Sequence, residues 1–128
     1  MSLDLTTALL VALCGGLGAM ARYGLDRAIT AVARRRERRV PGYPWGITAV
    51  NLSGSLALGL LLGLAVDSPA VLTGFLGGYT TFSTASLDTL RLFRERRIGA
   101  ALLNGLGMLL GCAVLAALGI ILGQSLRG

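Results

Sequence analysis

The chain has 128 residues, 54% of them hydrophobic, and a mean hydropathy of +0.73. A soluble domain of this size cannot bury so much apolar surface, because its surface is large relative to its volume. The formal net charge of +6 does not indicate nucleic-acid binding, since the arginines that carry it flank apolar segments rather than forming one soluble basic face.

Four apolar segments each approach or exceed the roughly 20 residues that span a bilayer. They lie near Leu5–Tyr23, Trp45–Val66, Val71–Leu90 and Gly99–Leu122. Together they account for nearly the whole chain. We therefore expect an all-α membrane protein, with residues 1–128 forming a single domain of four transmembrane helices in the lipid bilayer.

The first segment ends in a run that contains Arg22. A guanidinium at the bilayer centre costs about 2.5–3.5 kcal/mol on insertion scales, so its depth matters. One interpretation is an arginine that snorkels to the membrane interface. The other is a group that attracts anions at the mouth of a pore.

Arginine distribution predicts the orientation of the chain. All twelve basic residues are arginine, and ten lie in the two segments that join spans 1 to 2 and spans 3 to 4. These ten are Arg27, Arg34, Arg35, Arg36, Arg38, Arg39, Arg91, Arg94, Arg96 and Arg97. Because basic loops stay in the cytoplasm, we expect both termini outside it.

The second segment carries Asn51 and Ser55 on one helical face. An asparagine within a span often links helices, at about 0.6 kcal/mol for each hydrogen bond. Its amide also offers two donors without a fixed charge, which suits an anion ligand. Both interpretations remain open from the sequence.

The third segment contains the stretch around which the chain is organised, Gly74–Ser86 (GFLGGYTTFSTAS). Three glycines loosen its backbone, and five hydroxyl residues then fall within seven positions. This composition predicts a helix that is broken within the membrane, where irregular backbone needs shelter from lipid. Close packing between helices is the alternative explanation for so many small residues.

Catalysis is not indicated. The chain has no histidine, and its few carboxylates stand at span ends or in loops rather than in facing pairs. A proton-coupled transporter needs a carboxylate or histidine within a span. A small antiparallel drug exporter is therefore a weak alternative, because span 1 has no glutamate.

The stretch Gly74–Ser86 resembles the signature of the Fluc/CrcB fluoride channels, and the resemblance extends over essentially the whole chain. Arg22, Pro44-Trp45-Gly46 and Ala49-Val50-Asn51-Leu52 match other parts of that family's pattern. The resemblance implies a fluoride-specific channel in a bacterial plasma membrane, which lets fluoride leave the cytoplasm passively and so lowers its toxicity.

The same resemblance implies an antiparallel dimer with a structural sodium ion. The sodium would be held by backbone carbonyls of Gly77 and Thr80 from both subunits, which agrees with the preference of sodium for oxygen ligands. The fluoride pore would be lined by Asn51, Phe82, Ser83 and Thr84, with Arg22 at its mouth. Amide and hydroxyl groups donate hydrogen bonds to fluoride, and the edge of a phenylalanine ring is electropositive.

The chain also departs from the family. Ala85 replaces a second phenylalanine, and Asn104, Met108 and Cys112 stand where the fourth span usually carries a tyrosine and serines. An antiparallel homodimer needs nearly balanced loop charge, which this chain lacks. We therefore expect pairing with an oppositely oriented paralogue rather than with itself. A non-conducting or half-pore subunit of such a heterodimer is the alternative function.

Overall fold

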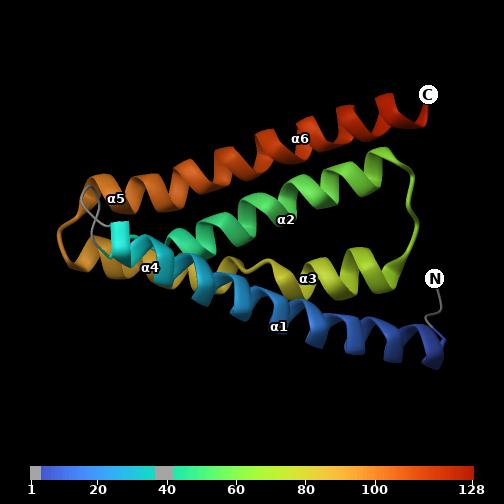
Figure 1. Ribbon diagram of the computed structural model, residues 1–128, viewed down its shortest axis with the longest axis horizontal. Coiled ribbons are helices and arrows are strands. Elements are labelled where there is room, and N and C mark those ends of the chain that lie inside the picture. Colours follow the sequence, from blue (N-terminus) through green and yellow to red (C-terminus); the bar gives the residue numbers. More distant parts are fainter. Residues whose placement is uncertain (1–3, 37–41) are drawn as a thin grey trace.

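The computed structural model describes residues 4–36 and 42–128, and every regular element within these ranges is helical. The elements are α1 (Leu5–Arg36), α2 (Trp45–Gly63), the π-helix η1 (Ala70–Phe75), α3 (Leu76–Tyr79), α4 (Phe82–Arg94), α5 (Ile98–Leu102), the π-helix η2 (Leu103–Gly107) and α6 (Met108–Arg127). Figure 1 shows the passes running along one axis, with the start of α1 and the end of α6 at the same end of the bundle. The all-helical, four-pass prediction is confirmed.

Three of the passes are continuous helices that are long and apolar enough to cross a membrane: Leu5–Arg36, Trp45–Gly63 and Ile98–Arg127. The remaining pass is divided into η1, α3 and α4, and it is interrupted at Thr80 and Thr81. The predicted break in the third span is therefore present. It follows the glycines instead of coinciding with them.

The predicted basic loops are much shorter than expected. α1 continues thirteen residues beyond Tyr23, so that Arg27 and Arg34–Arg36 lie on a helix. Arg91 and Arg94 likewise belong to the last turns of α4. The prediction of loops is wrong here because hydropathy falls at these positions while helix propensity stays high, arginine and alanine being good helix formers. Arg38 and Arg39 lie outside the described residues.

α2 and α6 pack along a seam of glycines. A Cβ atom added to Gly59 would overlap the backbone of Ala116, and one added to Gly119 would lie 2.5 Å from the carbonyl oxygen of Leu56. Such contacts require glycine, because any side chain would force the two backbones apart. The glycines of spans 2 and 4 thus allow α2 and α6 to pack closely, and this pair has the most extensive contact of any two described elements.

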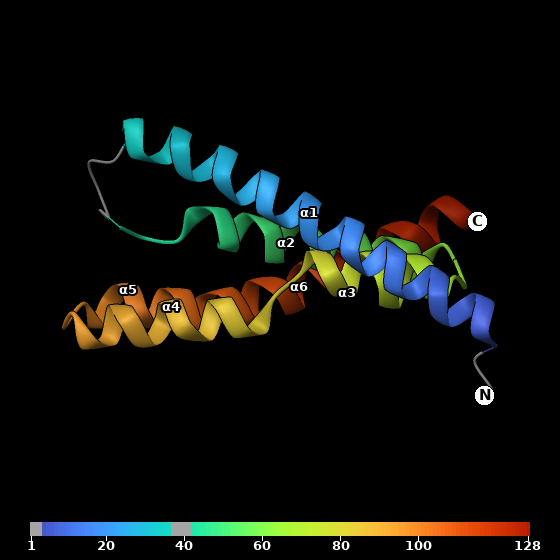
Figure 2. The ribbon, with the colours of Figure 1, turned by 90° about the horizontal axis from the view of Figure 1, so that it is seen from below.

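The break lets the third pass change its packing partner. Before the break, η1 and α3 pack against α1, with Gly78 seated directly on the backbone of Gly15. After the break, α4 packs against α5 and η2. Figure 2 shows α1 diverging from the paired α4 and α5, which leaves the start of α4 at the apex of a wedge.

Candidate functional site at the helix break

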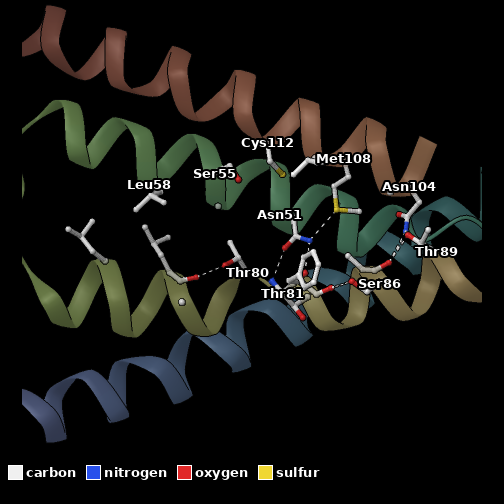
Figure 3. Close-up of a pocket in the computed structure, with 18 residues that line it drawn as sticks. Asn51, Ser55, Leu58, Thr80, Thr81, Ser86, Thr89, Asn104, Met108 and Cys112 are labelled. Carbon is white, nitrogen blue, oxygen red and sulfur yellow. Dashed lines mark hydrogen bonds between the residues drawn. The ribbon is translucent and has the colours of Figure 1, made fainter. Parts of the chain in front are cut away.

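Two residues of extended backbone interrupt the third pass. Thr80 has φ −81° and ψ 158°, and Thr81 has φ −148° and ψ 120°. The Asn51 side chain fills the gap: its Nδ2 donates to the Thr81 carbonyl at 2.8 Å, and its Oδ1 accepts from the Thr81 N–H at 2.8 Å (Figure 3). The amide thus replaces the helical partners that Thr81 lacks.

The end of α3 presents carbonyl oxygens to its surroundings. In an unbroken helix the Thr81 N–H would donate to the carbonyl of Gly77, but here it donates to Asn51. Arg22 reaches the same end, where its Nη1 donates to the Thr80 carbonyl at 3.4 Å. A cationic side chain at the C-terminus of a helix is electrostatically favourable. Arg22 therefore lies beside the break, well inside α1.

The start of α4 presents the opposite polarity. Thr81 caps this helix, because its Oγ1 accepts from the N–H of Thr84 at 3.2 Å. The N–H groups of a first helical turn have no intrahelical acceptors, and they favour anions. The break therefore places a cation-attracting end and an anion-attracting end two residues apart, as in membrane proteins whose half-helices bind ions.

A cavity of about 370 Å³ lies against the break, between α2, the third pass and the start of the fourth (Figure 3). Its polar lining comes from Asn51, Ser55, Thr80, Thr81, Ser86, Thr89 and Asn104. Phe82, Met108 and Cys112 contribute apolar or weakly polar surface. Asn51 and Met108 are both buried, and Asn51 also donates to the Met108 sulfur at 3.2 Å.

The four residues predicted to line a fluoride pore do not face one cavity. Asn51 and Phe82 line the cavity at the break. Thr84 instead lines a second cavity of about 290 Å³, whose charged lining is Asp26, Arg34, Asp88 and Arg91. Ser83 is exposed and lines neither cavity. The structure thus brings together two of the four, because successive residues of α4 point in different directions.

Phe82 is 86% exposed, the highest exposure of any large hydrophobic side chain among the described residues. In a chain that spans a bilayer, a ring so exposed contacts either lipid or a second chain.

The polar face of α4 was not predicted from the sequence. Ser86 and Thr89 line the cavity one and two turns after Phe82. The spacing of four and seven residues from Phe82 could have revealed this face. Asn104 was noted as a departure from a pattern, yet it is only 1% exposed and donates to the Ala85 carbonyl at 3.1 Å and to the Thr89 hydroxyl at 2.8 Å. It therefore ties the fourth pass to α4.

The predicted sodium ligands, Gly77 and Thr80, lie at the end of α3 beside the break. Both would offer main-chain oxygens, and among the described residues no group of three or more His, Cys, Asp or Glu side chains could hold a metal ion. The Gly77 carbonyl lacks its helical donor, and space is open beside this exposed residue. The 3.4 Å bond from Arg22 to the Thr80 carbonyl is long and weak. The two carbonyls are oxygen donors of the kind that a hard cation prefers.

Comparison with known proteins places this fold in a family. Residues 9–120 match the family model described as CrcB-like protein, Camphor Resistance (CrcB). The chain belongs to the CrcB-like family. A relative from Leifsonia xyli named fluoride-specific ion channel FluC 1 is 46% identical, over 90% of this chain and 85% of its own length. FluC from Magnetococcus marinus is 43% identical, over 89% and 94% respectively.

A further relative within this CrcB-like family, from Mycolicibacterium paratuberculosis, is named fluoride-specific ion channel FluC 2 and is 50% identical over 73% of this chain and 75% of its own. The family membership confirms the resemblance that rested on Gly74–Ser86, Arg22 and the start of span 2. It also sets aside the drug-exporter alternative.

Proposed function

We propose that the protein is a subunit of a fluoride-specific ion channel that lets fluoride leave the cytoplasm passively. The observation that carries the proposal is the break at Thr80 and Thr81, where the Asn51 amide and the first turn of α4 meet a cavity. The relatives named as fluoride-specific ion channels support it. They also favour a channel over an enzyme.

The chemistry of the site suits an anion that only accepts hydrogen bonds. Fluoride must exchange its hydration shell for donors, and those that line the cavity at the break are the Asn51 amide and the ring edge of Phe82. The hydroxyls of Ser83 and Thr84 lie outside this cavity and would donate to fluoride at another point of the pathway. Arg22 adds a fixed positive charge beside the break. A narrow pathway with few fixed charges favours a small anion, whereas a field of cations would admit anions of every size.

A sodium ion at the break would have a structural role. Gly77 and Thr80 would hold it through their backbone carbonyls, and a second chain would supply the remaining oxygens. The ion would supply a fixed positive charge at the ends of two α3 helices, which otherwise carry partial negative charge. A site built of main-chain oxygens tolerates side-chain changes that preserve the backbone.

In this proposal the active assembly is an antiparallel dimer. The chain pairs with a paralogue that is inserted in the opposite orientation. Phe82 and Ser83 are exposed in the single chain, as expected if a partner covers them. The last turns of α1 and α4, which carry Arg34–Arg36, Arg91 and Arg94, lie at the same end of the bundle, opposite the start of α1 and the end of α6. This bias favours one orientation, with basic segments in the cytoplasm and termini outside. Relatives named FluC 1 and FluC 2 accord with such pairs.

A half-pore subunit is the second candidate. Ala85 and the cavity lining from Met108, Leu109 and Cys112 offer few hydrogen-bond donors. One of the two pathways of a heterodimer would then depend on groups that the partner supplies. The alternative shares the assembly and differs only in how many pathways conduct.

The test is fluoride efflux from liposomes that contain the purified chain, alone and with its paralogue. With a potassium leak supplied, internal fluoride should discharge while chloride stays inside, and no proton gradient should be needed. Equal efflux of chloride, or a requirement for a proton gradient, would exclude a fluoride-specific channel.

A further inference from the structure

Asn51 has no unused hydrogen-bond donor in this chain. One amide proton goes to the Thr81 carbonyl at 2.8 Å and the other to the Met108 sulfur at 3.2 Å. The orientation of the amide is fixed, because a flipped amide would place its oxygen against the Thr81 carbonyl and its NH₂ against the Thr81 N–H. An anion that uses Asn51 must therefore displace one of these two acceptors.

The two acceptors differ greatly in strength. The bond to Thr81 is half of a reciprocal pair that closes the helix break, so losing it would leave a backbone carbonyl unsatisfied. A thioether is a weak acceptor, and it loses little when its donor departs. Met108 is thus the partner that an anion can replace.

Met108 is also free to move without disturbing the backbone. Methionine is unbranched and has three rotatable bonds, so its sulfur can leave Asn51 while the helix stays in place. Both residues line the cavity of about 370 Å³, and this space can receive the displaced side chain (Figure 3).

We infer that Met108 is a positioning residue, whose sulfur holds the second amide proton of Asn51 in the empty pathway and yields it to fluoride. The inference rests on the proposed channel function. A buried donor needs a partner, and the thioether satisfies it at low cost. Fluoride accepts hydrogen bonds strongly and gains from the exchange.

Met108→Leu tests this role, because leucine has a similar volume and no acceptor. Without the competing acceptor, the fluoride concentration that gives half-maximal efflux should fall about twofold, which is less than the roughly fivefold of one ordinary net hydrogen bond because a thioether is a weak acceptor. Met20→Leu is the matched control, since Met20 lies on α1 with 71% of its surface exposed. It makes the same chemical change at a residue that does not line the cavity, and its concentration dependence should equal that of the wild type.

A second measurement does not depend on transport. In nitrogen-15 NMR spectra of the fluoride-free assembly, one of the two Asn51 side-chain amide protons should shift in Met108→Leu and stay unchanged in Met20→Leu. An unshifted amide, or a conducting Met108→Leu channel with the wild-type fluoride dependence, would overturn the inference. A wild-type assembly that carries no fluoride would instead overturn the proposed function, and the NMR result would still decide whether the contact exists.

Discussion

Asn51 and Thr81 are thirty positions apart in the chain, yet they exchange two hydrogen bonds of 2.8 Å. The side-chain amide of one residue pairs with the main-chain amide of the other, as neighbouring strands do in a sheet. This pairing lets the backbone leave the helix inside an apolar bundle, where an unpaired N–H or carbonyl would be costly.

Replacing Asn51 should therefore destabilise the chain as well as impair ion flow. Asn51→Leu leaves both Thr81 groups without a partner and should lower the free energy of unfolding by about 2–4 kcal/mol. Unfolding in sodium dodecyl sulfate, followed by circular dichroism, measures the change. Ser125→Ala, at the exposed end of α6, is the control and should unfold like the wild type. An Asn51→Leu variant of unchanged stability would show that the pairing does not support the break.

Two adjacent glycines should respond differently to the same substitution. A Cβ at Gly78 would overlap the Gly15 carbonyl, whereas one at Gly77 meets nothing within 4 Å in the single chain. Gly78→Ala should therefore lower stability by about 1–3 kcal/mol, as overpacking does. Gly77→Ala should leave the unfolding of the monomer nearly unchanged and weaken dimer formation, if a partner and sodium occupy this side. Thermal unfolding and analytical ultracentrifugation separate the two effects, and equal destabilisation by both substitutions would contradict them.

Removing sodium should weaken the assembly without unfolding each chain. When N-methylglucamine replaces sodium, we expect the dissociation constant of the dimer to rise about tenfold or more. The carbonyl ends of two α3 helices, which carry partial negative charge, would then face each other without a cation between them. Thr80→Ser keeps the main-chain carbonyl and should keep the sodium dependence. If the dimer has the same affinity in sodium as in N-methylglucamine, sodium does not bind between the two chains at Gly77 and Thr80.

Expression of the chain without the proposed paralogue tests the assembly. An impermeant thiol reagent, applied to cysteines introduced at Ser125 or near Asp4, should label both ends from outside the cell. Fluoride efflux should be at least tenfold lower than with the paralogue present. Labelling from both sides of the membrane, together with full efflux from the single gene, would instead identify a dual-topology homodimer.

The sequence was sufficient to predict four passes and the broken third span, because hydropathy and the cluster of hydroxyl residues are local signals. It could not give the length of α1, since the helix continues through thirteen residues whose polarity hides their helix propensity. It also suggested that the glycines make the break. In the structure Gly74 and Gly78 are helical and allow close contact with α1, while the break itself depends on Asn51.

For a related reason, the sequence could not predict that the expected pore residues would line two different cavities. Phe82, Ser83 and Thr84 are consecutive, but their directions depend on where α4 begins after the break. Similarly, the partner of Arg22 is a carbonyl that exists as a free acceptor only because the helix ends there. Contacts that depend on where the backbone changes direction cannot be predicted from the sequence pattern and are seen only in the structure.

The position of the break along the third pass has a consequence for how two chains can meet. Ten helical residues precede it in η1 and α3, and thirteen follow it in α4. These lengths correspond to about 15 Å and 20 Å, so the interruption stands close to the middle of the pass. A chain inserted upside down then carries its own interruption at nearly the same depth. Two such chains can bring Gly77 and Thr80 face to face without either one shifting along the membrane normal.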